Sequence, residues 1–155
     1  MIRKALKKDA AAVAALADEL WPGHPDGELK SEFEVSLEDD DTAVFLLLSG
    51  SEPAGFAQCS LRRDYVEGTE SSPVGYLEGI YVKAPFRHEG HARALLCACE
   101  EWAREKGCCE FASDCELHNT QSLAFHLACG FEEANRIICF TKSLGAVRPK
   151  PQAGG

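Results

Sequence analysis

The fold is decided by one stretch, Tyr81-Val82-Lys83-Ala84-Pro85-Phe86-Arg87-His88-Glu89-Gly90-His91-Ala92-Arg93, which runs from a strand through a loop into a long helix. Backbone N–H groups from His88 to Ala92 would open at the helix N-terminus, where unpaired donors and the helix dipole favour a phosphate. Gly90 permits close approach of an anion, and Arg87 can add positive charge. The same pattern also suits a plain loop with a capping glycine. Neither Gly-Lys-Ser/Thr nor Gly-x-Gly-x-x-Gly occurs, so no Walker A loop or dinucleotide fingerprint is indicated.

Hydrophobic periodicity on either side of this stretch predicts the remaining elements. Strands are expected at residues 2–6, 42–48, 54–61, 75–82 and 109–113, with one or two last strands at 131–142. Helices are expected from Asp9, within 26–41, from Gly90 to Gly107, and from Asn119 to Gly130. The order β-α-α-β-β-β-α-β-α-β-β implies a mixed sheet with helices on its faces. We expect residues 1–143 to form a single domain and residues 144–155 to form a disordered tail.

The composition indicates an ordinary soluble globular protein. The 155 residues are 45% hydrophobic and 26% charged, and 16 Lys and Arg against 25 Asp and Glu give a net charge of −9. No apolar run approaches the ~20 residues of a membrane span, and no signal peptide is visible, so a cytoplasmic location is expected. Net acidity disfavours nucleic acid and anionic membranes as partners, while it permits a cationic one.

Eight cysteines are many for this length, yet none forms a C-x-x-C pair. Without zinc-type spacing or a secretory signal, neither a metal site nor a disulfide framework is expected. Several cysteines occupy apolar positions of helices or strands, where a thiol acts as a small buried hydrophobe. We therefore expect the cysteines to fill the core; they are Cys59, Cys97, Cys99, Cys108, Cys109, Cys115, Cys129 and Cys139.

The loop pattern Arg87-x-x-Gly90-x-Ala92 resembles the pyrophosphate loop of the GNAT superfamily of acetyl-CoA-dependent N-acetyltransferases. The element order over residues 1–143 is similar as well. More specifically, five separated stretches look like the aminoglycoside 6′-N-acetyltransferases: 20–25, 64–68, 71–73, 77–82 and 112–114. The resemblance implies an α/β (α+β) fold with a mixed, mostly antiparallel central sheet, helices on both faces and a splay between the fourth and fifth strands.

The resemblance also implies a binding site for acetyl-CoA, whose pantetheine arm would lie in the splay. The residues carried over for this cosubstrate are Ile80, Tyr81, Val82, Arg87, His88, Glu89, Gly90, His91, Ala92, Arg93 and Asn119. From the residues alone, Ile80 and Val82 also suit the core, and Asn119 suits a plain helix N-cap. Gly79 interrupts the strand, and a glycine in mid-strand marks a bulge or a close backbone approach.

Two carboxylates are candidates for the catalytic and acceptor-binding groups. Glu78 lies in an apolar strand, where an unpaired carboxylate is costly, so it either pairs with an arginine or faces the acceptor cleft. By resemblance, Glu78 binds the substrate ammonium or accepts its proton, and Asp114 binds the aminoglycoside. Asp114 also suits helix capping or loop solvation. An amine must be neutral to attack, so some base is required, and the sequence leaves open which carboxylate takes the proton.

Trp21 and Tyr65 match positions that line the acceptor site of these enzymes, although Trp21 also suits a hydrophobic plug. Three features depart from the family pattern. Glu89 puts an anion in the pyrophosphate loop, so it should point outward or pair with Arg87 or Arg93. His126 occupies about the position of the tyrosine that many GNAT enzymes use as a general acid; a histidine there could donate a proton or simply pack in the core. Some aminoglycoside enzymes carry another acid shortly after their Gly-Phe motif. Here Glu132 and Glu133 are followed by Asn135, so the sequence leaves open whether that contact to the acceptor exists.

The sequence thus favours an acetyl-CoA-dependent enzyme that acetylates the 6′-amino group of aminoglycosides by direct attack in a ternary complex, without a metal, and as a possible homodimer. The alternatives are a GNAT enzyme acting on another polyamine or on a protein amine, and a CoA- or aminoglycoside-binding protein with little turnover. Residues 26–41 hold eight acids against one base, a net charge of −7. This acidic segment follows Trp21 and could attract a polycation, or it is simply a solvated helix face.

Overall fold

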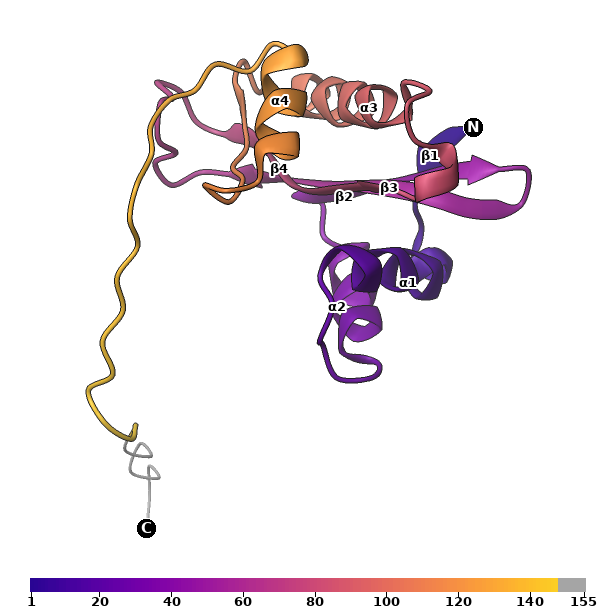
Figure 1. The fold of residues 1–155 in the computed structure, drawn as a ribbon, viewed down its shortest axis with the longest axis horizontal. Helices are drawn as coiled ribbons and strands as arrows, with labels where there is room; N and C mark the ends of the chain where they lie inside the picture. The colour runs from indigo at the N-terminus through magenta and orange to yellow at the C-terminus, as the bar shows by residue number, and fades with distance from the viewer. Residues whose placement is uncertain (148–155) are drawn as a thin grey trace.

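A five-stranded sheet with helices on both faces organises the protein, as the computed structural model of residues 1–147 shows (Figure 1). The strands follow one another in chain order and are β1 (Ile2–Lys4), β2 (Thr42–Ser49), β3 (Glu52–Arg62), β4 (Val74–Val82) and β5 (Phe111–Ala112). The first four pair antiparallel, and β5 pairs parallel with β4. The expected mixed, mostly antiparallel sheet is confirmed.

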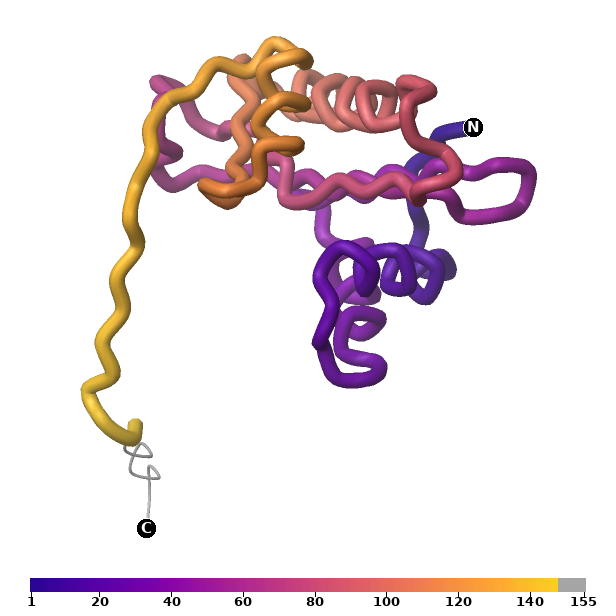
Figure 2. Tube along the Cα trace, in the orientation of Figure 1, coloured from indigo at the N-terminus to yellow at the C-terminus, as the bar shows by residue number. Residues whose placement is uncertain are grey.

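The helices form a layer on each side of this sheet (Figure 2). They are α1 (Ala10–Leu20), α2 (Glu28–Ser36), α3 (His91–Glu105) and α4 (Thr120–Ala128), with short 3₁₀ helices at Lys7–Asp9 and Ala84–Phe86. On one face α1 and α2 bury Leu16 and Phe33 against Phe56 of β3. On the other face α3 buries Leu95 and Leu96. Side chains alternate along a strand, so each central strand contributes to both cores.

The predicted apolar face of α3 is confirmed, with Cys99, Trp102 and Ala103 buried beside the two leucines. The helix ends before Gly107, whose φ of 91° is the left-handed conformation that glycine adopts at little cost. This long helix holds the loop that precedes it against the end of β4.

The pairing between β4 and β5 is limited to two positions. Gly75 pairs with Phe111 and Tyr76 with Ala112; beyond them, no strand in residues 1–147 pairs with the β5-facing side of β4. The expected splay between the fourth and fifth strands is therefore confirmed. Its cause is the shortness of β5, because the chain turns away after Ala112. The backbone of β4 from Leu77 to Val82 is left open along that edge.

The prediction of one or two last strands at residues 131–142 is wrong for this chain. After Phe131 no residue up to Val147 lies in a helix or strand, and all of residues 132–147 are exposed. These residues, the C-terminal arm, run away from the sheet as an extended segment (Figures 1 and 2). A strand needs a neighbouring edge to pair with, and the arm points away from the edge of its own sheet. Of the expected tail at 144–155, residues 148–155 lie outside the described residues.

Burial divides the cysteines. Cys59, Cys99 and Cys108 are buried, which confirms the core-filling prediction for these three, and Cys129 is half-buried. The remaining four are exposed: Cys97, Cys109, Cys115 and Cys139. All eight are free thiols, and no group of His, Cys, Asp or Glu side chains in residues 1–147 is arranged to hold a metal ion. No helix in this part of the chain is both long and apolar enough to cross a membrane.

Asp9 precedes α1 but caps the turn before it. Its carboxylate accepts hydrogen bonds from the Arg3 guanidinium at 2.8 and 2.9 Å and from the backbone N–H of Leu6 at 2.8 Å. The expected N-cap of α1 is thus present by position but makes no side-chain bond to that helix. The Arg3 hydrogen bond is the main reason that the pKa of Asp9 is lowered to about 2. Asp9 therefore ties β1 to the start of the helical layer.

We expect Asp9→Asn to lower the free energy of unfolding at pH 7 and to have little effect near pH 2. The folded-state pKa lies below the unfolded value of about 3.9, so the stabilisation is present above that value and is lost as the pH falls through about 2. Urea unfolding of both proteins between pH 7 and pH 2 measures this difference. Asp18→Asn, at an exposed carboxylate on α1, is the matched control. An Asp9→Asn effect that is the same at every pH would contradict the prediction.

Candidate active site

Glu78 lies at a β-bulge in β4. On β3, Gln58 pairs with Gly79 and the next residue, Cys59, pairs with Leu77, so Glu78 has no partner across the strands. A bulge inserts one residue into a strand and changes the direction of its side chain, and bulges are common beside active sites. This local irregularity is what takes a carboxylate out of an otherwise apolar strand.

The Glu78 carboxylate is paired with an arginine, as one of the two sequence interpretations required. Arg62 Nη2 donates to both carboxylate oxygens at 3.0 Å, and Ser60 Oγ donates at 2.6 Å. The Glu78 side chain is 29% exposed, so water still reaches it. The carboxylate is held in place and its charge is compensated, while one side of the group remains accessible.

Arg62 links Glu78 to the second predicted carboxylate. Its guanidinium lies 3.4 Å from the centre of the Tyr76 ring, and the Tyr76 hydroxyl donates a hydrogen bond to Asp114. Burial, together with the hydrogen bond to Asp114, raises the pKa of Tyr76 well above its usual range, so the phenol keeps its proton and acts as a donor. Glu78, Arg62, Tyr76 and Asp114 thus form one connected group, the carboxylate cluster.

Trp21 packs directly on the backbone beside this bulge. A Cβ atom placed on Gly79 would lie 2.5 Å from two atoms of the Trp21 ring, so the ring occupies the space that any side chain there would fill. Of the two alternatives predicted from the mid-strand glycine, the bulge is confirmed at the preceding residue, and the close neighbour of Gly79 is a side chain and not backbone. Trp21 also meets Phe56 edge to face, with ring centres 6.1 Å apart. The indole is therefore a fixed wall next to Glu78.

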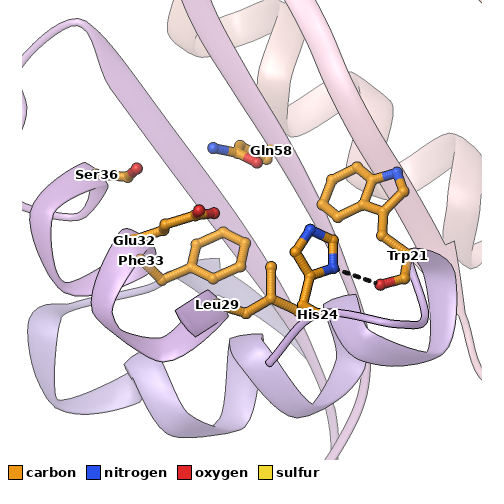
Figure 3. A pocket seen from close by; sticks show the side chains of 7 residues that line it. All are labelled: Trp21, His24, Leu29, Glu32, Phe33, Ser36 and Gln58. Carbon is orange, nitrogen blue, oxygen red and sulfur yellow. Dashed lines mark hydrogen bonds between the residues drawn. The ribbon is translucent and has the colours of Figure 1, made fainter. Parts of the chain in front are cut away.

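Trp21 forms one side of a cavity of about 310 Å³ between the sheet and the α1–α2 layer (Figure 3). The other lining residues are His24, Leu29, Glu32, Phe33, Ser36 and Gln58. The acidic segment thus contributes one carboxylate, Glu32, to this cavity. In the sequence this segment follows Trp21, and nothing there singles out Glu32. No local signal distinguishes it from the other acids, because its position depends on how α2 packs against β3.

Tyr65 is separate from this arrangement. It lies on the loop between β3 and β4, is 77% exposed, and does not line the cavity. The neighbouring Val66 is buried against Val74 and Tyr76, so the loop is attached to the sheet next to the carboxylate cluster. The structure therefore brings Trp21, Glu78 and Asp114 into one region of the sheet and leaves the Tyr65 ring in solvent.

Along β4, the predicted cosubstrate residues divide between the two faces. Ile80 and Val82 belong to the core under α3, as the structural interpretation proposed. Tyr81 faces α1, where its hydroxyl donates to Glu19, and this bond raises the pKa of the tyrosine. The carbonyl of Val82 accepts a hydrogen bond from Arg87 Nε at 2.7 Å. The core interpretation of Ile80 and Val82 is confirmed, and the free edge of the strand carries only backbone groups.

The predicted anion-binding loop has the expected conformation. Gly90, at φ 83°, is the N-cap of α3, and the first intrahelical bond runs from Ala94 N–H to the Gly90 carbonyl at 3.1 Å. The N–H groups of His91, Ala92 and Arg93 have no acceptor within the helix, which is the usual basis of a phosphate site. His88 adopts φ 65°, a conformation that costs energy for a residue with a side chain.

The charged side chains of this loop have partners of their own. Glu89 points outward, as expected, but its partner is His91 Nε2 at 3.0 Å and not Arg87 or Arg93. Arg93 Nη2 donates to the carbonyl of Ala128 at the end of α4, at 2.6 Å. Backbone N–H groups are therefore the main donors that this loop offers to an anion.

On α4, Asn119 is confirmed as the N-cap, since its side chain accepts from the N–H of Ser122 at 3.0 Å. His126 Nδ1 lies 2.7 Å from the Ser122 carbonyl, which can only accept, so this nitrogen carries a proton. Its Nε2 lies 2.8 Å from Ser113 Oγ, within hydrogen-bonding distance. His126 is thus directed at the residue preceding Asp114, which the sequence did not reveal because β5 and α4 meet only in the fold.

The sheet with a splay after β4, followed by a turn that leaves the first N–H groups of α3 without acceptors in the helix, is the arrangement of an acetyltransferase fold. The chain matches the model of the Acetyltransferase (GNAT) family over residues 13–131 and belongs to that family.

Within this family, the chain is similar to enzymes named as aminoglycoside 6′-N-acetyltransferases. An aminoglycoside N(6′)-acetyltransferase type 1 from Stenotrophomonas maltophilia is 48% identical over 144 residues, covering 92% of this chain and 93% of the relative. One of the same name from Salmonella typhimurium is 45% identical over 127 residues, covering 82% and 88%. The structure of AAC(6′)-Iy with the bisubstrate analogue CoA-S-monomethyl-acetylneamine has a TM-score of 0.88 at 42% identity, covering 92% of this chain and 97% of that one. AAC(6′)-Ih from Acinetobacter baumannii has a TM-score of 0.87 at 35% identity, covering 94% and 99%.

Proposed function

We propose that this protein transfers the acetyl group of acetyl-CoA to the 6′-amino group of aminoglycosides. The observation that carries the proposal is the carboxylate cluster beside Trp21, at the bulge of the strand that borders the splay. Two carboxylates and an aromatic wall suit an acceptor that is both cationic and sugar-like. The names of the relatives, and the bisubstrate analogue bound by one of them, support the same reaction.

In this proposal acetyl-CoA is the cosubstrate that supplies the thioester. Its pantetheine arm would lie along the backbone of residues 80–82, and its pyrophosphate would meet the N–H groups of residues 88–93, with Arg87 and Asn119 close by. The open edge of β4 and the acceptor-free N–H groups at the start of α3 suit these two parts of the molecule. Acetylation would remove one positive charge from the drug and weaken its hold on RNA phosphates.

The chemical step is direct attack in a ternary complex. A carboxylate, Glu78 or Asp114, takes a proton from the substrate ammonium, either directly or through water. The neutral amine then attacks the acetyl carbonyl carbon, the carbon–sulfur bond breaks and the CoA thiolate leaves. The acylated nitrogen loses its extra proton, and that proton converts the thiolate to the free thiol, directly or through water. A backbone N–H of β4 can stabilise the oxyanion that forms on the way. Trp21 would contact the acceptor on one side, and Tyr65 would contact it from the loop.

We further propose that residues 1–143 form one acetyltransferase domain, that the enzyme works in the cytoplasm, and that it is a homodimer. A cytoplasmic location agrees with a reaction that consumes acetyl-CoA. The net charge of −9 suits a polycationic substrate better than it suits nucleic acid or an anionic membrane.

The decisive experiment measures free thiol release from acetyl-CoA in the presence of kanamycin, other aminoglycosides and simple polyamines. Thiol release that depends on aminoglycosides carrying a 6′-amine supports the proposed function. Release that occurs only with polyamines or a protein amine would assign a different acceptor. Binding of either ligand without release would contradict the enzymatic function.

We expect Asp114→Asn to raise the KM for kanamycin about tenfold or more while the KM for acetyl-CoA changes little. The substitution removes one negative charge from the acceptor side but keeps the size of the side chain and its ability to accept from Tyr76. Steady-state kinetics with each substrate varied in turn provide the measurement. An unchanged kanamycin KM would show that Asp114 does not bind the acceptor.

A further inference from the structure

Tyr76 connects the two carboxylates of the carboxylate cluster, yet the proposed reaction gives its hydroxyl no role. The residue is 6% exposed and packs with Val66 and Val74. A phenylalanine would make the same apolar contacts. A buried phenol needs a hydrogen-bond partner, and here the partner is the carboxylate of Asp114. The hydroxyl is therefore a specific link between the core of the sheet and the acceptor side.

Asp114 has little else to fix its direction. β5 ends at Ala112, two residues earlier, and Asp114 is an exposed residue in an irregular segment that pairs with no strand. An exposed carboxylate on such a segment samples several rotamers, and a ligand that requires one of them must order it on binding. The bond from Tyr76 selects one orientation in advance. It engages Oδ2 of Asp114 and leaves Oδ1 for an ammonium group.

The Tyr76 ring is itself held by Arg62. The centre of the guanidinium lies 3.4 Å from the centre of the ring, and the same guanidinium donates to both carboxylate oxygens of Glu78 at 3.0 Å. The ring is thus fixed by the group that fixes the other carboxylate. One side chain thereby relates the position of Asp114 to that of Glu78.

The phenol is a permanent donor. Burial, followed by the hydrogen bond to Asp114, raises the pKa of Tyr76 well above its usual range. The hydroxyl keeps its proton over the whole pH range in which acetyl transfer to an amine is measured. Tyr76 is therefore neither the base nor a carrier of the substrate proton, and its hydroxyl contributes by holding Asp114.

We propose that Tyr76 is a positioning residue of the acceptor site, which holds the Asp114 carboxylate in the orientation that binds an ammonium group of the aminoglycoside. Tyr76 acts through Asp114 and does not touch the reacting atoms. This inference rests on the proposed function and deepens it, because it assigns the alignment of the acceptor to a residue outside the chemical step. Its contribution belongs to acceptor binding and not to turnover.

The first test is Tyr76→Phe, followed by steady-state kinetics. The KM for kanamycin should rise about threefold to tenfold, while kcat and the KM for acetyl-CoA stay within about twofold. The ring and its stacking on Arg62 remain, and the exposed Asp114 is hydrated, so no buried group loses a partner. Ser71→Ala removes a hydroxyl that donates to Glu110 and is the matched control, expected to change none of these values. A lower melting temperature with an unchanged kanamycin KM would overturn the inference.

The second test asks whether Tyr76 acts through Asp114. In an Asp114→Ala background, Tyr76→Phe should change the kanamycin KM by less than about twofold, because the partner of the hydroxyl is gone. Replacing Tyr76 with 4-aminophenylalanine keeps the ring and places an N–H donor at its tip, so the KM should return to within about twofold of the original value. A full effect of Tyr76→Phe without Asp114, or no recovery with 4-aminophenylalanine, would overturn the inference.

Calorimetric titration of kanamycin into the CoA-saturated protein separates this inference from the proposed function. Kanamycin binding that is threefold to tenfold weaker in Tyr76→Phe supports the positioning role, whether or not the unchanged chain releases thiol. Binding without thiol release contradicts only the enzymatic function. Equal affinity of the two proteins for kanamycin overturns the positioning role alone, and an unchanged chain that does not bind kanamycin overturns both.

Discussion

Glu78→Gln is expected to lower kcat/KM for kanamycin by about 10²- to 10⁴-fold, the range typical for loss of a group that moves a proton. Glutamine keeps the shape of the side chain at the bulge and its acceptor for Ser60, but it cannot take a proton or neutralise a substrate ammonium. The KM for acetyl-CoA should change little, because Glu78 is hydrogen-bonded to Ser60 and Arg62 of β3 and not to the loop before α3. Steady-state kinetics with both substrates, at several pH values, provide the measurement.

Two controls separate this effect from a loss of structure. Glu116→Gln removes the same charge from an exposed position shortly after Asp114 and should leave kcat/KM within about twofold. Arg62 loses its counter-ion in Glu78→Gln but keeps its stacking on Tyr76, so the near-ultraviolet circular dichroism should be retained. A Glu78→Gln protein that is folded and turns over kanamycin at nearly the original rate would exclude Glu78 as the base and transfer that role to Asp114 or water.

Gly79→Ala is expected to raise the KM for aminoglycosides by about tenfold to a hundredfold through a single added carbon. That carbon would lie 2.5 Å from the Trp21 ring, a separation that side chains do not tolerate, so the indole must leave its place. The cavity then loses one wall and the bulge loses its cover. Because the chain has only two tryptophans, the movement can be followed by fluorescence of Trp21 in a Trp102→Phe background.

A second substitution tests the cause. Trp21→Phe removes the part of the ring that Gly79→Ala meets, so the double variant should bind kanamycin better than Gly79→Ala alone. Such rescue identifies a steric conflict between two neighbours, which a general loss of stability would not produce. If the two substitutions simply add their effects, the wall formed by Trp21 is not what the glycine protects.

Residues close together in sequence were predicted best. The turn at Gly90, the capping by Asn119 and the apolar face of α3 depend on local conformation and periodicity, and all three are present as expected. The mid-strand Gly79 indicated a bulge or a crowded position, but the sequence could not show that the crowding comes from the Trp21 ring, which belongs to another layer of the fold. In the same way, the sequence left two interpretations of Glu78 open: pairing with an arginine or facing the acceptor cleft. Only the register of β3 against β4, shifted by the bulge, places Arg62 beside it.

The one clear error has its physical origin in a partner distant along the chain. The 131–142 pattern correctly indicated an extended apolar segment, but a strand also requires an edge, and the chain's own edge is out of reach. Arg87 and Arg93 stay predicted pyrophosphate residues, and the fold places backbone carbonyls within their reach as well. Tyr65 stays a predicted acceptor contact, and its ring lies in solvent. Sequence patterns describe what a segment can do, and packing decides which of its options is used.

The positions of the free thiols make it possible to measure how often the core between α3 and the sheet opens. Cys59 and Cys99 are fully buried between the sheet and α3, and contact with Cys59, together with burial, raises the pKa of Cys99. A thiol-specific reagent needs the thiolate, so it can modify these two only when the core under α3 opens. The four exposed cysteines react at once and must be titrated before any CoA-dependent colour is read. Cys108 is buried and Cys129 is half-buried, so both are replaced by alanine for this measurement. The slow phase that remains then comes from Cys59 and Cys99 and would time the separation of α3 from the sheet.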